Sequence, residues 1–287
     1  RIEVLRDGAG AQYGADAVAG VINIILDDAG DGGALEASYG AHHTKLEPID
    51  RTLTDGQSAS LAAKVGTSLG DDGFLRVGLE YKELRPTNRA GFDQVPPWDQ
   101  TPANLAVQGQ RNYQHGNGAA KDINGWFNSE IPLGESAVFY AFGTYNQRDT
   151  EGANYFRYPD GEANWPEVYP NGYRPVSIGE NLDLAGVAGV RGHVGEWDID
   201  ASLNHGRNAY TYRLRNSLNA SLGPSSPTRF KTGDYRFDQT LANVDISRLF
   251  AQGDNLHTFA SGVEYRVETY ETGAGDPASY AAGPFTD

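Results

Sequence analysis

The sequence contains no cysteine and no methionine, and only 23 of its 287 residues are lysine or arginine, against 38 aspartates and glutamates. The absence of cysteine excludes disulfides, a thiolate nucleophile and cysteine-ligated zinc or iron–sulfur sites. A net charge of −15 argues against a nucleic-acid partner, because phosphate binding needs a basic face. No apolar run reaches the roughly 20 residues of a transmembrane helix. A membrane β-barrel is not excluded, because its strands appear in a sequence only as short segments of alternating polarity.

From residue 35 onward, apolar and polar residues alternate with the period of two that is typical of β-strands. One segment places Leu75, Val77, Leu79 and Tyr81 on one face and Arg76, Gly78, Glu80 and Lys82 on the other. The pattern predicts about nine strands of roughly ten or more residues each. Residues 137–148 carry aromatic side chains in both phases, so the sequence leaves their faces undecided.

The connections between these segments fall into two classes. Short turns are predicted at 70–73, 134–136, 195–196 and 252–255, and long polar loops near 44–56, 88–119, 150–177, 213–234 and from 271. Short and long connections alternate, so one rim of the sheet carries turns and the other carries loops. This sorting is typical of outer-membrane barrels, which have short periplasmic turns and long external loops. The predicted fold class is an all-β membrane protein, an antiparallel up-and-down transmembrane barrel with a wide polar lumen.

Three local patterns resemble enzyme or metal motifs. Gly8–Gly14 is close to a dinucleotide fingerprint, but its third glycine is displaced and no βαβ unit follows. Gly66–Gly70 matches the spacing of a nucleophile elbow, but a turn and a strand follow where a helix is needed. His42 and His43 would point to opposite faces of a strand. We therefore expect no catalytic activity, no cofactor and no metal.

The N-terminal stretch carries a more specific pattern. Residues 1–6 read Arg-Ile-Glu-Val-Leu-Arg, and residues 12–26 run from Gln-Tyr-Gly-Ala-Asp to Gly-Val-Ile-Asn-Ile-Ile-Leu. These residues closely resemble the C-terminal part of the plug domain of TonB-dependent outer-membrane receptors. Asp7-Gly8 replaces the family's Gly-Pro pair, and Ala19 replaces the first of its paired glycines. The motif residues are Arg6, Tyr13, Gly14, Gly20 and Asn23.

The resemblance implies a plug folded inside a barrel of about 22 strands, which imports a scarce solute with energy delivered through TonB. Residues 1–27 would be the end of an α+β plug, 28–34 a linker, and 35–287 the first part of the barrel. The chain would be a fragment that lacks the TonB-contacting segment and the last strands. The implied partners are outer-membrane lipid, the TonB complex and an extracellular cargo such as an iron–siderophore, cobalamin, haem or an oligosaccharide. The intact protein would be a monomeric barrel in the bacterial outer membrane.

Physical roles follow for three residues of this motif. Gly14 and Gly20 are expected to adopt positive φ or to approach other backbone closely. Arg6 is expected either to pair with a lumen carboxylate or to stay solvated, since surface ion pairs of arginine are common and weak. The candidate carboxylates are Glu80, Asp200 and Glu264.

Aromatic residues in the predicted long loops are the candidates for solute capture, because their rings can stack on sugars or planar chelates. The alternative is that these rings pack against each other and only cover the barrel mouth. The candidate residues are Trp98, Arg111, Tyr113, Tyr155, Tyr158, Trp165, Tyr169 and Tyr173.

The strand pattern also predicts a lipid-facing band, with aromatic girdles at its rims. The outward residues are Leu61, Val65, Leu79, Phe127, Leu184, Ile199, Leu203, Val244, Ile246 and Val263, and the rim residues are Tyr81, Trp197, Phe259 and Tyr265. Two other functions stay open. A passive porin would share the strands but leave residues 1–26 unexplained, and a secreted carbohydrate-binding module would not carry an outward apolar band.

Overall fold

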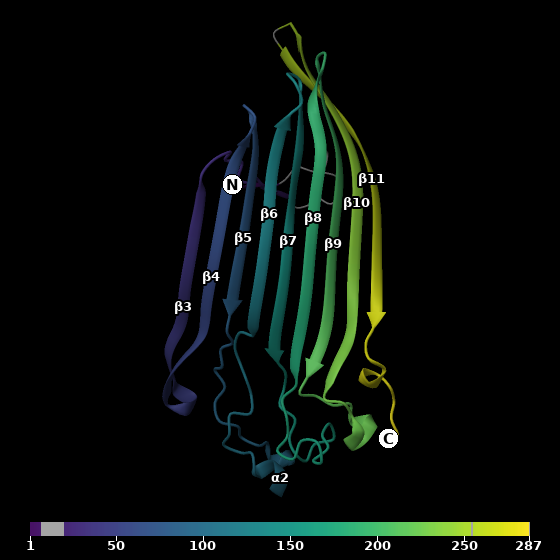
Figure 1. Cartoon of the computed structure of the whole chain (residues 1–287). Coiled ribbons are helices and arrows are strands. Elements are labelled where there is room, and N and C mark those ends of the chain that lie inside the picture. Colours follow the sequence, from purple (N-terminus) through teal and green to yellow (C-terminus); the bar gives the residue numbers. More distant parts are fainter. Residues whose placement is uncertain (7–19, 254, 287) are drawn as a thin grey trace.

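The computed structural model describes residues 1–6, 20–253 and 255–286, most of which form antiparallel β-structure (Figure 1). An N-terminal hairpin pairs β1 (Ile2–Leu5) with β2 (Val21–Ile24). Nine further strands form one sheet in which every strand pairs with its neighbours in sequence. They are β3 (Gly33–Leu46), β4 (Arg51–Leu69), β5 (Gly73–Leu84), β6 (Ala119–Pro132), β7 (Ala137–Ala153), β8 (Val176–Val194), β9 (Trp197–Arg215), β10 (Arg229–Gln252) and β11 (Asn255–Ala274). The expected all-β antiparallel meander is confirmed, with β3 and β11 as its edges.

The two faces of the nine-stranded sheet differ in composition. We call the face that residues 27–32 contact the inner face and the opposite one the outer face. Residues paired across neighbouring strands share a face. The register therefore shows, for each strand in turn, which residues lie on the inner face and which on the outer face. Val65, Val77 and Phe127 form one such row on the outer face. All ten residues predicted to point outward share this face, and Leu203 and Val263 there are 64% and 74% exposed.

The outer apolar band ends at a row of charged residues on its loop side. Glu83, Lys121, Asp149 and Glu180 pair in succession across β5 to β8. Tyr81 lies two residues before Glu83 on the same face, at the band's edge. At the turn end, the rings of Trp197 and Phe259 pack edge to face, 5.9 Å between centroids. An apolar band bounded by aromatic and then charged residues is the pattern of a strand wall facing lipid.

Tight turns join the strands at one end of the sheet. They occupy residues 70–72, 133–136 and 195–196, as the sequence predicts, and Gly253 follows β10 at the same end. The β8–β9 turn has only two residues, and its first, Gly195, has a φ of +63°. Side chains disfavour this left-handed backbone, so glycine suits the turn.

The strands extend further than expected at the opposite end, which carries the loops (Figure 1). The predicted loop at 44–56 is wrong, because residues 42–46 pair with 51–55 and leave only residues 47–50, with η1 (Glu47–Ile49), as the connection. The other loops span 85–118, 154–175 and 216–228, and the chain leaves β11 after Ala274. The residues beyond the apolar band are polar, so the sequence predicts a loop there. In the structure these residues continue the hydrogen-bonded pairing of the strands.

Residues 137–148, undecided from the sequence, now have assigned faces. Tyr140 pairs with Glu130, and Phe142 pairs with Asn128, which places both rings on the inner face. Phe139 and Tyr145 lie on the outer face.

Buried apolar side chains gather at the loop end rather than on the sheet. Most of the well-buried ones belong to the loops or the adjoining strand ends: Leu46, Ile49, Ala90, Val95, Val107, Ala120, Tyr173 and Phe230. The loops also contain η2 (Pro97–Asp99), α2 (Pro102–Leu105), η3 (Ala220–Ser225) and η4 (Pro277–Ser279). The only α-helix in the described ranges, α2, has four residues, and no helix there is long and apolar enough to cross a membrane.

Candidate functional site

Asp27, just before β3, connects the N-terminal segment to the inner face of the sheet. One carboxylate oxygen lies 2.8 Å from Lys64 Nζ on β4 and 3.3 Å from Arg76 Nε on β5. Asn128 Nδ2 on β6 donates to the backbone carbonyl of Asp27, at 3.2 Å. Three neighbouring strands therefore hold one residue.

Arg76 extends this contact along the linker. Its guanidinium is buried, and Nη1 donates to the carbonyls of Asp31 (3.0 Å) and Gly32 (2.9 Å). The hydrogen bond from Lys64 holds the pKa of Asp27 below its usual value, and the charge of Arg76 acts in the same direction. The linker is bound to the sheet by charge and by backbone hydrogen bonds.

The other motif residues of the N-terminal segment act within its hairpin. Arg6 is exposed and makes no ion pair with Glu80, Asp200 or Glu264 in the described part of the chain. Gly20 has a φ of +141°, and a Cβ there would lie 2.4 Å from the carbonyl oxygen of Leu5. Asn23 Nδ2 donates to Glu3 Oε2 across the hairpin at 3.4 Å. Tyr13 and Gly14 lie outside the described residues.

The loops 85–118, 154–175 and 216–228 pack together with the C-terminal residues 275–286, and we call this assembly the loop cap. Arg89 pairs through two nitrogens with Asp55 of β4, at 2.5 and 2.8 Å. This bidentate pair fixes the first loop to the sheet.

Four of the candidate rings join one loop to another, those of Tyr113, Tyr158, Trp165 and Tyr169. Trp165 Nε1 donates to the carbonyl of Ala220 at 2.7 Å, and its ring contacts Phe285 edge to face. Tyr169 donates to the carbonyl of Ser217 at 3.3 Å and stacks on Tyr173, 4.4 Å between centroids. The rings of Tyr113 and Phe156 are 6.1 Å apart.

Tyr158 and Tyr173 are bound most tightly within the loop cap. The Tyr158 hydroxyl donates to Asp93 Oδ1 at 2.8 Å, and burial raises the pKa of the Tyr158 phenol. Tyr173 is 5% exposed and donates to the carbonyl of Ala163 at 2.7 Å. These contacts fit the packing alternative for the candidate aromatic residues.

Two candidate rings are instead open to solvent. Trp98 in η2 is 83% exposed, and Tyr155 is 74% exposed. An exposed aromatic ring on a rigid support can stack on a solute without losing other contacts. The loop cap therefore combines packed rings with two available ones.

A cavity of about 690 Å³ at the edge of the loop cap contains a cluster of arginines. Two of the candidate residues, Arg111 and Tyr169, line it. The Arg111 side chain donates to the carbonyls of Ala90 (3.2 Å) and Asn88 (3.1 Å). Arg174, Arg215 and Arg229 line the same cavity. Sequence reasoning missed these three, because 41 residues of chain separate Arg174 from Arg215 and no local motif joins them.

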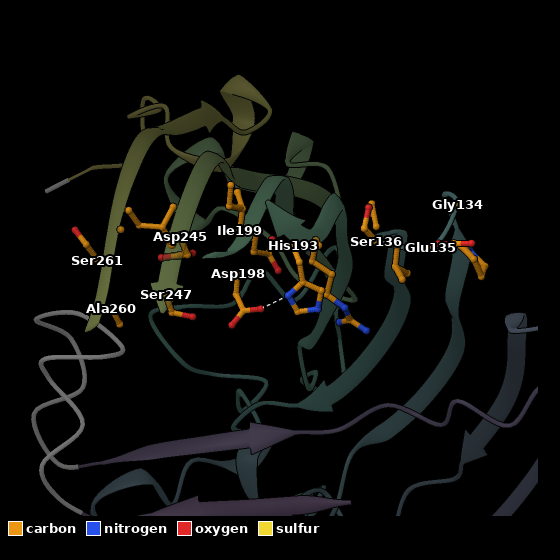
Figure 2. A pocket seen from close by; sticks show the side chains of 18 of the residues that line it. Gly134, Glu135, Ser136, His193, Asp198, Ile199, Asp245, Ser247, Ala260 and Ser261 are labelled. Atoms are coloured by element: carbon orange, nitrogen blue, oxygen red, sulfur yellow. Dashed lines mark ion pairs between the residues drawn. The ribbon is translucent and has the colours of Figure 1, made fainter. Parts of the chain in front are cut away.

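A second cavity, of about 890 Å³, opens on the inner face at the turn end (Figure 2). His193 and Asp198 form an ion pair there, at the ends of β8 and β9. Arg191 pairs with Glu130 at 2.6 Å, and Asp200 accepts a hydrogen bond from Tyr140 at 2.7 Å. These contacts give Asp198 and Asp200 a partner, and the cavity presents polar and charged side chains at the inner face.

Residues of the motifs that resemble a nucleophile elbow and a metal site lie in strands and bond to neighbouring segments. Ser68, the central serine of the nucleophile-elbow match, lies in β4 and donates to the carbonyl of Gly30 at 3.1 Å. His43 lies in β3 and its Nδ1 is 2.8 Å from Thr54 Oγ1 on β4. Within residues 1–6, 20–253 and 255–286, no group of three or more histidine or acidic side chains could hold a metal ion.

Comparison with known proteins adds no assignment. No protein-family model matches the chain. No curated protein matches it either.

Proposed function

We propose that this chain is part of a TonB-dependent receptor of the bacterial outer membrane, which takes up a scarce, bulky solute such as an iron–siderophore, cobalamin, haem or an oligosaccharide. The single observation that carries the proposal is the contrast between the two faces of the sheet. The outer face has an apolar band with aromatic edges, while the inner face is polar and binds the N-terminal segment through Asp27.

The band fits a lipid environment in both length and bounding residues. On β8, outer positions stay free of charged side chains from Leu182 to Val194. At about 3.3 Å per residue and a tilt near 40°, twelve steps span about 30 Å, comparable to the apolar height of outer-membrane barrels. The remaining strands would close the sheet, because an open edge leaves backbone groups unsatisfied in lipid.

The contact between the linker and the sheet favours a plugged receptor over a passive porin. A porin needs no N-terminal segment inside its wall, whereas here Asp27, Asp31 and Gly32 are held by side chains of the wall. Trp98 and Tyr155, exposed in the loop cap, are the side chains best placed to meet a solute first.

Solute uptake by cells with and without the gene tests the proposal. Cells that carry the full-length protein should accumulate one of the candidate solutes, and a protonophore should abolish the accumulation because TonB coupling needs the proton gradient. A strain lacking TonB serves as the control and should behave like the protonophore-treated cells. Uptake that persists in both would establish a passive channel instead.

A further inference from the structure

We propose that the arginine-lined cavity of the loop cap is a binding site for a small solute that carries two or more phosphate or carboxylate charges. Four guanidinium groups converge on it, those of Arg111, Arg174, Arg215 and Arg229, and none of the other lining residues is acidic. In a chain with a net charge of −15, such a concentration of positive charge is a local exception. Its volume, about 690 Å³, is in the range of small-molecule sites.

The arginines differ in how far their charge is already compensated. Arg215 pairs with Glu151 at 2.5 Å. Arg111 and Arg174 donate only to backbone carbonyls, Arg174 to that of Asn112 at 3.4 Å. The exposed guanidinium of Arg229 has no hydrogen bond or ion pair with the rest of the described chain.

This leaves three of the four cations without a carboxylate. Burial lowers the pKa of Arg174, because removing its cation from water is unfavourable when no anion lies beside it. A bound oxyanion would supply that partner, and guanidinium groups suit phosphate and carboxylate because their paired N–H groups match two oxygens. Phe156 and Tyr169 add an aromatic wall against which the remainder of a solute could lie.

The cavity lies on the outer side of the sheet, away from the inner face. Arg215 of β9 pairs with Val176 of β8 on one side and with Arg229 of β10 on the other. Val176 has the same phase on β8 as Leu182 and Leu184 of the apolar band. The proposed site is therefore separate from the solute path through the lumen and stands without the transport proposal.

The height of the cavity above the band favours a dissolved solute over a lipid headgroup. Val176 lies four residues before Glu180 of the charged row, and Arg215 lies four residues after Thr211, which pairs with Glu180. At about 3.3 Å per residue and a tilt near 40°, four residues correspond to about 10 Å beyond the band. The headgroup layer is only about 5–8 Å thick. The cavity consequently opens to water.

Diphosphate binding to the full-length protein, measured by calorimetry in a neutral detergent, tests the site. We expect saturable binding that weakens by about tenfold or more in Arg229→Gln, since a hydrogen bond between two charged groups is lost. Arg174→Gln should weaken it similarly. Arg213→Gln is the matched control, because Arg213 lies on the same face of β9 but is paired with Glu180 at 3.0 Å outside the cavity.

Two results would overturn the proposal. The first is that the full-length protein does not bind diphosphate, or that folded Arg229→Gln and Arg174→Gln variants bind it as tightly as the control variant does. The second comes from lipid nanodiscs with and without phosphatidylglycerol at physiological salt. Diphosphate binding that is lost only with phosphatidylglycerol would assign the cavity to lipid phosphate.

Discussion

At the scale of single residues, Asp27 is the side chain with the largest structural consequence. It joins Lys64 and Arg76 on two strands, and its backbone carbonyl accepts from a third strand. Because Arg76 is buried, its charge depends on these oxygens for compensation. The linker between the N-terminal hairpin and β3 is consequently fixed on the inner face.

We expect Asp27→Asn to loosen the linker by about 1–3 kcal/mol, because a charged hydrogen bond is replaced by a neutral one next to a buried cation. Amide hydrogen exchange at residues 28–33 measures the change and should become faster. Asp28→Asn is the control, since no ion pair or hydrogen bond of the Asp28 side chain is present among the described residues. Equal exchange in both variants would contradict the role of Asp27.

The same contact should depend on pH. The folded-state pKa of Asp27 is lowered, so ionisation stabilises the contact above the unfolded-state pKa of about 3.9. That stability is lost as the pH falls through the still lower folded-state value. The protection factors at residues 28–33, which correct exchange for its intrinsic pH dependence, should therefore be unchanged between pH 8 and about 5 and fall at lower pH. The Asp27→Asn variant should lack this acid-induced fall.

The loop-cap aromatic residues separate into two classes that substitution can distinguish. Trp165→Ala removes a hydrogen bond to Ala220 and a ring contact with Phe285, so it should open the loops to protease. Trp98→Ala should leave protease sensitivity unchanged, because Trp98 is 83% exposed, and should weaken solute binding. Limited proteolysis and binding of the identified cargo measure the two effects. Weakened binding in Trp165→Ala without loop opening would instead make Trp165 a direct contact.

At the scale of the strands, the proposed membrane barrel makes a testable distinction between substitutions on the outer face and on the inner face. Leu203 of β9 lies on the outer face between Ala188 and Ala242. Leu203→Arg should cost about 2–4 kcal/mol near the bilayer midplane, measured as reversible unfolding of the full-length protein in vesicles. The adjacent Asn204 lies on the polar inner face, so Asn204→Arg should cost much less. Similar costs for the two would invert the faces of this strand.

The strands also explain which connections the sequence predicts well. Turns such as 195–196 interrupt the alternation abruptly and contain glycine at a positive φ, so their positions are clear. Loop ends are less clear, because residues 42–46 and 51–55 are mostly polar yet paired. Polar side chains lie on both faces of the strands there, so alternation no longer marks a strand.

At the scale of the whole molecule, the sheet has two long unpaired edges. β11 runs for 20 residues, and its exposed side chains include Leu256, Val263 and Tyr265. Expressed alone, residues 1–287 should aggregate rather than insert, because lipid cannot satisfy the edge backbone groups. Gel migration before and after heating is the measurement, with the full-length protein as the control. Heat-modifiable migration by this chain would show that it closes without further strands.

The sequence by itself determined the local features of this protein. Alternation of period two defined the strands and put Leu203 and Val263 on one face, since adjacent residues of a strand point in opposite directions. Only the tertiary structure decided the contacts between distant segments. In the folded chain Asp27 lies beside Arg76, and one cavity is lined by Arg174, Arg215 and Arg229. Such contacts depend on register and loop packing across many residues, and no local pattern records them.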